Sequence, residues 1–385
     1  MRIMYIEYMF HTNQVSVMRG WIENRDEVLF VCHTKGVTEN HKYCEPFVLG
    51  FSKVFLTINS VHNKLLSKKN RLSSFPEAFS GKYGFPPMHR LCKLLREWKP
   101  DLVILRDRSV YSVCCYCACR KYRIPAILYN QSPYCPEEIK TDLIHRIIYK
   151  ITPKVRMTPV YGEVGKTNHN DNTFYVPFVI YPEVSYLNRD YFANGKINIF
   201  CIGKYEKRKN QLMLLEIVKE LKGQYDVTLT LAGEVSTEHH KLYYQKIRNY
   251  IEDNEMQKYV QCYKNYPSDK MEVLYRGSDL FVLPSTGEFA SVSQLEAMSY
   301  SIPVIVSDTN GTACYIKEGQ NGFVFKDNDQ NDLKEKILKV IEKRENILRM
   351  GRGSYELVEK EHSFEKYRER ILLMKTRVES LERKK

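Results

Sequence analysis

The segment DLFVLPSTGEFASVSQLEAMSYSIPVIVSD, from Asp279 to Asp308, places the strongest constraint on how this chain folds. Its two apolar runs, DLFVLPS and SIPVIVSD, are typical of buried parallel strands. A helix is predicted between them, with Ser291 or Ser293 as its N-cap. Parallel strands joined by a helix form a βαβ unit, so the segment predicts an α/β domain built on a parallel sheet.

Two carboxylates, Glu288 and Glu296, lie on either side of the turn from the first strand into this helix. Open α/β sheets bind ligands beyond the carboxyl ends of their strands, and the amides of a helix's first turn attract anions. We therefore expect a small site for an anionic ligand here. For Glu296 there is an alternative, a capping box in which Ser293 and Glu296 satisfy each other's backbone amides.

Apolar runs alternate with helical segments through both halves of the chain, which predicts an α/β fold. The strands predicted in the first half are RIMYIEY (2–8), EVLFVCH (27–33), FSKVFLTI (51–58), PDLVILR (100–106) and IPAILYN (124–130). Helices are predicted around 15–23, at 89–98 and through the cysteine-rich run VCCYCACRKY. In the second half, strands are predicted at 197–203, 226–233, 260–266, 279–285 and 301–308, and helices at 210–221, 239–254 and 270–278.

A chain of 385 residues exceeds the size of a single hydrophobic core, so two domains are expected. We place an N-terminal domain at 1–180, a linker at 181–195 and a C-terminal domain at 196–362. The last segment, 363–385, has a helical period; it is either a solvated helix or one that returns to the N-terminal domain. This order predicts two Rossmann-like, doubly wound domains that face each other across a cleft.

Charge and cysteine content narrow the class of protein. Of the net charge of +13, residues 1–180 carry +11 (26 Lys and Arg against 15 Asp and Glu). Such a field attracts nucleic acid, an anionic membrane or a phosphate-bearing substrate, but no nucleic-acid-binding motif accompanies it. With no secretory leader, no membrane-length apolar run and eleven scattered cysteines, we expect a cytoplasmic protein, at most peripheral at the inner face of the membrane. The clustered thiols are expected to be buried on a helix.

The loop GKYEKRKNQ is a second candidate for ligand binding. It places Lys204, Lys207, Arg208 and Lys209 between the end of a predicted strand and the start of a helix. A phosphate group there would meet several cations and the positive end of the helix dipole. The alternative is an ordinary solvated basic loop.

Five segments in order, GKYEKRKNQ, LAGE, GEFASVSQLEAM, PVIVSDTNG and EGQNGFVF, resemble the retaining family 4 glycosyltransferases (glycosyltransferase group 1) of the GT-B fold. The resemblance implies a hexosyltransferase that moves a sugar from a nucleotide-sugar donor to a glycan or lipid-linked saccharide in surface polysaccharide biosynthesis, without a metal or other cofactor. It implies a catalytic set of Glu288, against the donor sugar, with Lys204 and Lys209 on the diphosphate. It also implies a donor-binding set: Glu296 on the ribose hydroxyls, Arg208, and the backbone amides of Phe289, Ala290, Ser291 and Val292.

The N-terminal half offers candidates for contact with the acceptor at its predicted strand ends: His11, Arg106, Asp107, Arg108, Asn130 and Gln131. It also departs from the family pattern. The loop MFHTNQV lacks the usual glycines, and Gln131 and Cys314 replace a common histidine and a common glutamate. An inactive GT-B scaffold that binds nucleotide or glycan, or a partner subunit of an active transferase, is therefore the alternative. The Asp327-x-Asp329 pattern, a metal motif in other glycosyltransferase classes, is expected to be a solvated turn.

Overall fold

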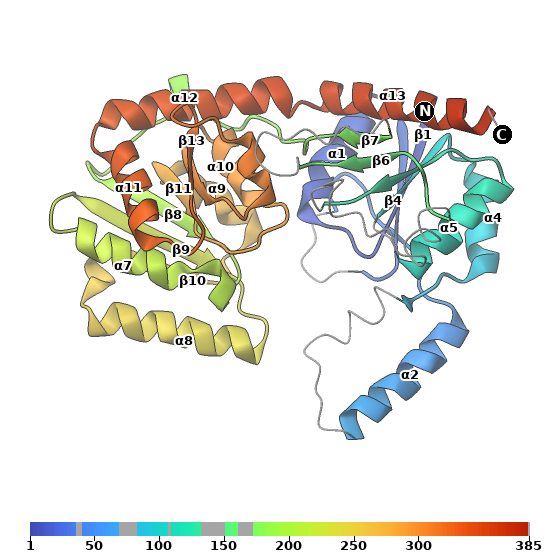
Figure 1. Cartoon of the computed structure of the whole chain (residues 1–385), viewed down its shortest axis with the longest axis horizontal. Coiled ribbons are helices and arrows are strands. Elements are labelled where there is room, and N and C mark those ends of the chain that lie inside the picture. Colours follow the sequence, from blue (N-terminus) through green and yellow to red (C-terminus); the bar gives the residue numbers. More distant parts are fainter. Residues whose placement is uncertain (36–40, 69–82, 107–108, 132–150, 161–171, 384–385) are drawn as a thin grey trace. The chain divides into compact units, whose positions relative to one another are not determined.

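The structure is a computed structural model that describes residues 1–35, 41–68, 83–106, 109–131, 151–160 and 172–383. The chain forms two compact units, shown in Figure 1. The N-terminal unit comprises Met1–Pro159, Asn168–Val179 and Phe364–Lys385. The C-terminal unit comprises Val160–Thr167 and Ile180–Ser363, and it includes the stretch 181–195 where we expected a linker.

The N-terminal unit is built on a parallel sheet. Its strands are β1 (Arg2–Glu7), β2 (Glu27–Cys32), β3 (Phe47–Val48), β4 (Leu102–Arg106), β5 (Ala126–Tyr129), β6 (Arg156–Thr158) and β7 (Thr173–Tyr175). Its helices are α1 (Thr12–Glu23), α2 (Lys53–Lys68), α4 (Met88–Trp98), α5 (Val110–Lys121) and α13 (Phe364–Arg383). The strand order is β3-β2-β1-β4-β5-β6-β7, and every pair is parallel.

One predicted strand of this unit is wrong. From Lys53 onward, FSKVFLTI forms the start of helix α2, and the strand that pairs with β2 is the shorter β3 upstream of it. The run is rich in β-branched and aromatic residues, which favour strands, but these residues pack at helical spacing. Phe51 and Phe55 meet with their ring centroids 5.2 Å apart, and Phe55 also meets Phe85 at 5.7 Å. The strands β6 and β7 were not predicted, because three residues are too short for a periodic signal.

The C-terminal helix α13 packs on the N-terminal unit, which is the second of its two expected positions. Its Phe364 ring lies so close to Gly20 of α1 that a Cβ on this glycine would be 2.0 Å from the ring. Buried hydroxyls join α13 to the sheet, since Tyr367 and Tyr5 lie 2.9 Å apart and the indole of Trp21 donates to Tyr5 at 2.8 Å. A helix buried in this way is part of the core of the unit.

The C-terminal unit repeats the same architecture. Its strands are β8 (Ile197–Ile202), β9 (Val227–Gly233), β10 (Val260–Lys264), β11 (Leu280–Leu283), β12 (Val304–Ser307) and β13 (Gly322–Phe325). Its helices are α7 (Gln211–Leu221), α8 (Glu238–Asp253), α9 (Met271–Arg276), α10 (Ser293–Ser299), α11 (Gln330–Ile341) and α12 (Arg344–Glu361). The sheet has the order β10-β9-β8-β11-β12-β13, again with every pair parallel.

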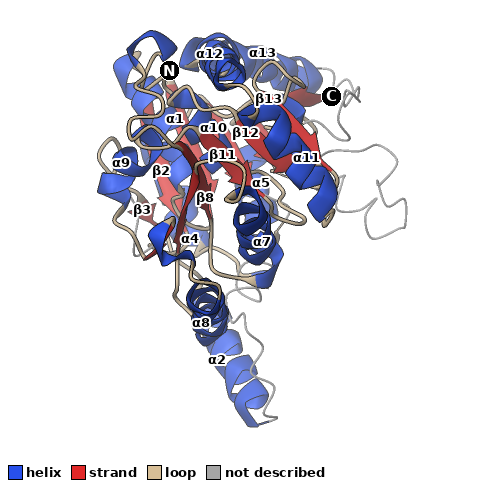
Figure 2. Ribbon diagram, turned by 90° about the vertical axis from the view of Figure 1, so that its left-hand side faces the viewer, coloured by secondary structure: helices blue, strands red, loops and turns tan. Residues whose placement is uncertain are grey.

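Both sheets therefore have the strand order of a doubly wound fold, as predicted, with helices packed against their strands (Figure 2). In such a sheet the chain leaves the first strand in one direction and returns to the fourth from the other, so the loops diverge and open a crevice beyond these two strands. This switch point lies between β1 and β4 in the N-terminal unit and between β8 and β11 in the C-terminal unit. Within the described residues, none of the helices is both long and apolar enough to span a membrane.

Candidate functional site

Two loops meet at the switch point of the C-terminal sheet. The loop after β8 forms a short 3-10 turn over Lys207–Lys209, and the loop after β11 runs to Glu288. The backbone amide of Thr286 donates to the carbonyl oxygen of Arg208 at 2.8 Å, which joins the two loops directly. At Gly203, just after β8, a Cβ would lie 3.2 Å from the side chain of Lys209, so the lysine stem packs over this glycine. The fold thus brings the predicted basic loop to the predicted acidic loop.

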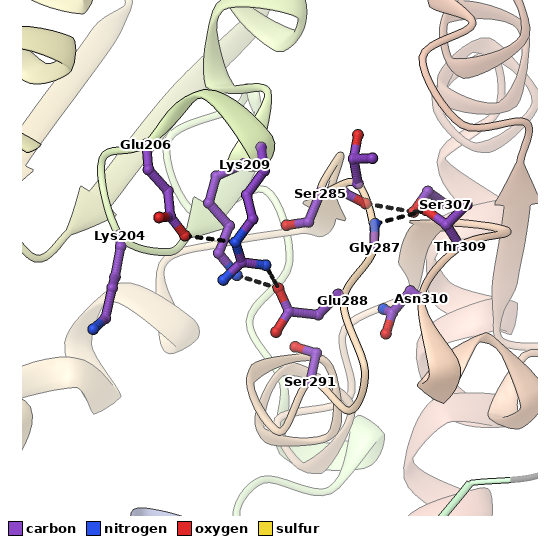
Figure 3. A network of polar contacts seen from close by, with 12 residues as sticks. Lys204, Glu206, Lys209, Ser285, Gly287, Glu288, Ser291, Ser307, Thr309 and Asn310 are labelled. Atoms are coloured by element: carbon purple, nitrogen blue, oxygen red, sulfur yellow. Dashed lines mark hydrogen bonds and ion pairs between the residues drawn. The ribbon is translucent and has the colours of Figure 1, made fainter. Parts of the chain in front are cut away.

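The side chains of these two loops form a cluster of opposite charges (Figure 3). One carboxylate oxygen of Glu288, Oε2, accepts from the ammonium of Lys209 and, at 2.8 Å, from Nη1 of Arg208. The side chains of Lys209 and Glu288 are only 11% and 18% exposed. Burial raises the pKa of the Glu288 carboxyl, but attraction by Lys209 and then by Arg208 outweighs it, so the pKa lies below its usual value. Glu288 is therefore ionised at neutral pH.

The loop that carries Glu288 is braced by the connection that follows β12. The amide of Gly287 donates to Oγ1 of Thr309 at 3.0 Å, and the amide of Gly311 donates to the carbonyl oxygen of Glu288 at 2.8 Å. A Cβ on Gly311 would lie 2.0 Å from the carbonyl oxygen of Phe289, so only glycine fits there without a shift of the backbone. These contacts fix the backbone on both sides of the carboxylate.

The backbone just beyond Glu288 presents amides to a ligand. In the described part of the chain, the amides of Phe289, Ala290, Ser291 and Val292 donate no hydrogen bond. The predicted N-caps are wrong. Helix α10 starts at Ser293 behind Val292, whose backbone is already helical (φ −85, ψ −31), and the hydroxyls of Ser291 and Ser293 contact each other at 2.9 Å. No serine oxygen therefore occupies these amides.

Glu296 lies in the first turn of α10, and its carboxylate accepts a hydrogen bond from the hydroxyl of Tyr275 at 2.7 Å. The capping-box interpretation is thus wrong, since the carboxylate is directed to α9 and not to an amide of its own helix. Burial raises the pKa of Glu296, and the hydrogen bond from Tyr275 partly offsets this. The Tyr275 ring is buried and stacks on Tyr300, with centroids 5.2 Å apart. Tyr275 was not singled out from the sequence.

Lys204 is not brought to Glu288. Its half-exposed side chain points away from the carboxylate in Figure 3 and lies 3.5 Å from the carboxylate of Glu234, which follows β9. Glu206, on the same loop, pairs instead with Nε of Arg208 at 2.8 Å and holds this guanidinium from its other edge. Of the four cations in the basic loop, Arg208 and Lys209 are the two that contact the acidic loop.

A second polar cluster occupies the switch point of the N-terminal sheet. The buried carboxylate of Glu7, which ends β1, pairs with Nη1 of Arg106, which ends β4, at 3.0 Å, and it accepts from the amide of Gln14 at 2.6 Å. Nη2 of Arg106 donates to Oε1 of Gln131 at 2.7 Å. Burial, followed by the positive charge of Arg106, lowers the pKa of His11 to about 4. Of the predicted acceptor residues, Arg106 and Gln131 thus contact each other, and the charge of Arg106 acts on His11.

The remaining candidates in this unit are placed differently. The backbone amide of Asn130 donates to the carbonyl oxygen of Met157 at 3.0 Å, which extends the sheet. Asp107 and Arg108 lie outside the described residues. Glu7 and Gln14 were missed, although a carboxylate that ends an otherwise apolar strand is a signal that the sequence contained.

Other candidate ligand groups have structural tasks. Asp327 accepts from the hydroxyl of Thr286 at 2.9 Å, and Asp329 caps α11 by accepting from the amide of Asp332 at 3.0 Å. Cys115 and Cys119 are buried thiols on α5, as expected, and burial raises the pKa of both. The expectation is wrong for Cys117, which is exposed on the same helix, and Cys114 is only partly buried. Among the residues that the structure describes, no group of His, Cys, Asp and Glu is arranged to hold a metal ion.

Comparison with known proteins agrees with this architecture. The model of the family "Glycosyl transferases group 1" matches residues 188–357, which contain both loops of the C-terminal switch point. An uncharacterised glycosyltransferase of Methanocaldococcus jannaschii is 28% identical over 165 residues, or 43% of this chain and 44% of that protein. The UDP-Gal:alpha-D-GlcNAc-diphosphoundecaprenol alpha-1,3-galactosyltransferase of Escherichia coli is 37% identical over 67 residues, 17% of each chain. The match thus spans less than half the length of each of these curated relatives.

A solved structure matches almost the whole chain. The crystal structure of an Anabaena protein, HepE, in complex with UDP and glucose has a TM-score of 0.69 at 13% identity and covers 97% of this chain and 98% of that one. At this identity the likeness shows the fold. Residues 188–357 therefore form a domain of the glycosyl transferases group 1 family, within a two-domain α/β fold of the GT-B type.

Proposed function

We propose that the protein is a retaining glycosyltransferase of the hexosyltransferase type, which moves a sugar from a nucleotide-sugar donor to a glycan or lipid-linked saccharide in surface polysaccharide biosynthesis. The group 1 domain covers the C-terminal switch point, and a structural neighbour was solved with UDP and glucose. The Escherichia coli relative is named for a UDP-Gal donor and a diphosphoundecaprenol-linked acceptor. These names support the classes of donor and acceptor.

The observation that carries the proposal is the pairing of Arg208 and Lys209 with Glu288 at this switch point, next to four backbone amides that make no hydrogen bond to any of the described residues. When the bond between the anomeric carbon and the diphosphate breaks, negative charge grows on the departing nucleoside diphosphate. Fixed cations and amide dipoles stabilise that charge without having to reorganise. In this proposal they do so without a metal ion.

The two glutamates have different roles in the proposal. The ionised carboxylate of Glu288 lies against the donor sugar and holds Arg208 and Lys209 in place. Glu296, whose carboxylate is oriented by Tyr275, accepts from the hydroxyls of the nucleotide ribose. Lys204 is a candidate second cation for the diphosphate, because its exposed pair with Glu234 is weak enough to exchange for a phosphate.

The N-terminal switch point is the proposed acceptor site. Arg106 and Gln131 offer a guanidinium and an amide, and His11, with its pKa near 4, is a neutral imidazole at pH 7. Neutral imidazole and amide groups suit the hydroxyls of a saccharide, while the guanidinium suits a phosphate on a lipid-linked acceptor.

The test is a thermal-shift screen of UDP-, GDP-, ADP- and TDP-sugars, followed by an assay for nucleoside diphosphate release with the donor found. We expect Lys209→Met to lower turnover by about 10²–10³-fold, the effect of removing one such electrostatic group. The control is Lys241→Met, which removes an exposed lysine paired to Glu238 on α8. A chelator is expected to leave turnover unchanged.

The outcomes separate the alternatives. Nucleotide binding without any release of nucleoside diphosphate would favour the inactive scaffold. Equal turnover in Lys209→Met and Lys241→Met would exclude the proposed role of the charge cluster. A chelator that abolishes turnover, with recovery on adding a divalent cation, would show that a metal takes part.

A further inference from the structure

The stretch 181–195, where we expected a linker, is bound to the C-terminal ends of two helices of its own unit, α9 and α10. At the end of α10, the amides of Glu183 and Val184 donate to the carbonyl oxygen of Ser299 at 2.9 and 3.0 Å. Just beyond α10, the hydroxyl of Tyr191 donates to the carbonyl oxygen of Ser301 at 2.6 Å. Because the last carbonyls of a helix have no partner within it, these bonds fix the end of α10.

At the end of α9 the same role falls to the guanidinium of Arg189. Its Nη2 donates to the carbonyl oxygens of Tyr275, at 2.9 Å, and of Ser278. Arg189 is only 9% exposed, and it forms no ion pair in the part of the chain that the structure describes. Burial lowers the pKa of this guanidinium. Burying a cation without a carboxylate partner costs free energy, so a contribution to stability alone is a poor account of this residue.

Helix α9 depends on its surroundings for its position. It has six residues, of which Tyr275 is the one that is buried. A helix this short is not stable on its own, so contacts with the rest of the unit hold it in place. The Tyr275 ring meets Phe200 edge-on and stacks on Tyr300, both with centroids 5.2 Å apart, while Arg189 holds the backbone of the same residue. These contacts together fix the direction of the Tyr275 side chain.

The Tyr275 side chain ends on the carboxylate of Glu296. The tyrosine hydroxyl donates to Oε2 at 2.7 Å, whereas Oε1 makes no hydrogen bond within the described residues. An O–H···O hydrogen bond forms only at about 2.5–3.0 Å, so a small displacement of α9 would break it. The carboxyl group would then lose the contact that offsets its burial, and burial favours its protonated form, which accepts fewer hydrogen bonds.

We propose that Arg189 is a positioning residue for donor recognition: it holds the end of α9, which keeps the Tyr275 hydroxyl on Oε2 of Glu296, so that Oε1 is presented to the ribose hydroxyls of the nucleotide. This inference rests on the proposed function, from which it takes the contact between Glu296 and the ribose. It adds a residue outside the two loops of the switch point, which acts on the ribose site through Tyr275.

The experiment measures the affinity of the full-length protein for UDP and for 2′,3′-dideoxy-UDP, two probes that differ only in the ribose hydroxyls. UDP is the first choice because a structural neighbour was solved with it, and the matching adenine and guanine nucleotides replace it if the parent protein does not bind UDP. The variants are Arg189→Met, Arg189→Lys, Tyr275→Phe and the double variant Arg189→Met/Tyr275→Phe. The matched control, Arg344→Met, removes an exposed arginine that likewise donates to a backbone carbonyl, that of Gly195 at 2.6 Å, and lies over a ring, that of Phe192 at 4.5 Å.

We expect the parent and the control to bind UDP at least ~10-fold more tightly than its dideoxy analogue, because hydrogen bonds to a charged acceptor are strong. In Arg189→Met and in Tyr275→Phe this preference should fall to ~3-fold or less. The double variant should lose no more of it than Tyr275→Phe alone, because both changes break the same path. Arg189→Lys keeps the charge but cannot reach both carbonyls, so its preference should be intermediate; it takes the place of Arg189→Met if that variant does not fold.

The ratio of the two affinities separates positioning from a general loss of structure, which would weaken both nucleotides alike and leave the ratio unchanged. A preference in Arg189→Met equal to that of the control would overturn the inference and leave the transferase proposal standing. A double variant that loses the sum of the two single effects would also overturn it, because Arg189 would then act on a separate path. A parent protein that binds the nucleotides without preferring ribose would refute the role of Glu296 and this inference with it, and one that binds none of them would overturn the proposed function as well.

Discussion

The ion pair between Lys209 and Glu288 gives a prediction that can be tested without knowing the substrate. Removing one partner of a buried ion pair costs about 3–5 kcal/mol, because the other charge is left without compensation. In this site Glu288 Oε2 has two cationic partners, and Arg208 remains at 2.8 Å when Lys209 is replaced. We therefore expect Lys209→Met to cost about half of that value, about 2 kcal/mol. The methionine keeps most of the stem that packs over Gly203.

The assay is thermal unfolding of the unliganded protein. In a unit of this size, about 1 kcal/mol shifts Tm by about 2–4 °C, so Lys209→Met should lower Tm by roughly 4–8 °C. Lys241→Met is the control, because Lys241 and Glu238 lie 3.0 Å apart but are 62% and 76% exposed. Such an exposed pair contributes about 0–1 kcal/mol, so the control should shift Tm by less than about 4 °C.

The effect of Lys209→Met on Tm should depend on pH, because the ion pair requires an ionised Glu288. The folded-state pKa of Glu288 is held below its ordinary value, so its stabilisation is present above pH 4.5 and is lost as the pH falls through the lowered folded-state pKa. The difference in Tm between the parent protein and Lys209→Met should therefore shrink once the pH falls below 4.5, while the control changes little. Equal Tm losses in the two variants at pH 7, or a difference that survives full protonation of the carboxylates, would refute the reasoning.

Three further predictions follow from the same geometry. Gly311→Ala should lower Tm and abolish the thermal shift with donor, because its Cβ would meet a backbone carbonyl at 2.0 Å, while Gly223→Ala, with its nearest atom at 3.9 Å, should be tolerated. Tyr275→Phe removes a hydrogen bond that lowers the pKa of Glu296, so this pKa should rise further. Donor binding should then weaken at a higher pH than in the parent protein as the solution is acidified, and an unchanged pH dependence of donor binding would contradict the hydrogen bond. His11 should titrate in an NMR experiment near pH 4, and an ordinary pKa near 6.5 would contradict the lowering by desolvation and by the charge of Arg106.

The sheets could be predicted because their strands are buried on both faces. A parallel strand covered by helices needs apolar residues throughout, and runs such as DLFVLPS have few other uses in a soluble protein. The same rule failed at FSKVFLTI. In this short run of phenylalanines and β-branched residues, the apolar positions fit the two-residue period of a strand and also the 3.6-residue period of a helix. The longer helix and the burial of Phe55 became evident only with the structure. Sequence patterns of eight residues do not separate these cases.

The position of the candidate site could be predicted from the sequence, but the hydrogen bonds and ion pairs within it could not. Lys209 and Glu288 follow neighbouring strands, and strand ends at a switch point meet, so their proximity followed from the fold. Which groups pair depends on side-chain direction, for which the sequence has no signal. Lys204 turns to Glu234, while Glu296 turns to a tyrosine from the preceding helix. Hydrogen bonds between residues of different elements are where sequence reasoning fell short in both units.

Each switch point holds an ion pair between a residue near the end of the first strand and a residue near the end of the fourth strand, counted in chain order. The strand that supplies the carboxylate and the strand that supplies the cation are exchanged between the two sheets. In the N-terminal sheet the carboxylate comes from the first strand, Glu7, and the cation from the fourth, Arg106. In the C-terminal sheet Lys209 follows the first strand, and Glu288 follows the fourth. The charged side chains at both switch points are largely shielded from water, and such a charge is stable only beside a partner of opposite sign.

The two pairs differ in their access to water, and this difference distinguishes their roles. The side chain of Glu7 is fully buried and paired with Arg106. An anionic ligand that bound Arg106 there would have to lose its own hydration beside the carboxylate of Glu7, and this desolvation costs free energy. Glu288 and its cations reach solvent, Arg208 most of all. In the proposed function a diphosphate binds these cations, and Glu288 turns to the attached sugar. In the proposed function, the C-terminal pair therefore exchanges charge with the donor, whereas the N-terminal pair orients the guanidinium and the amide of Gln131 toward the hydroxyls of the acceptor.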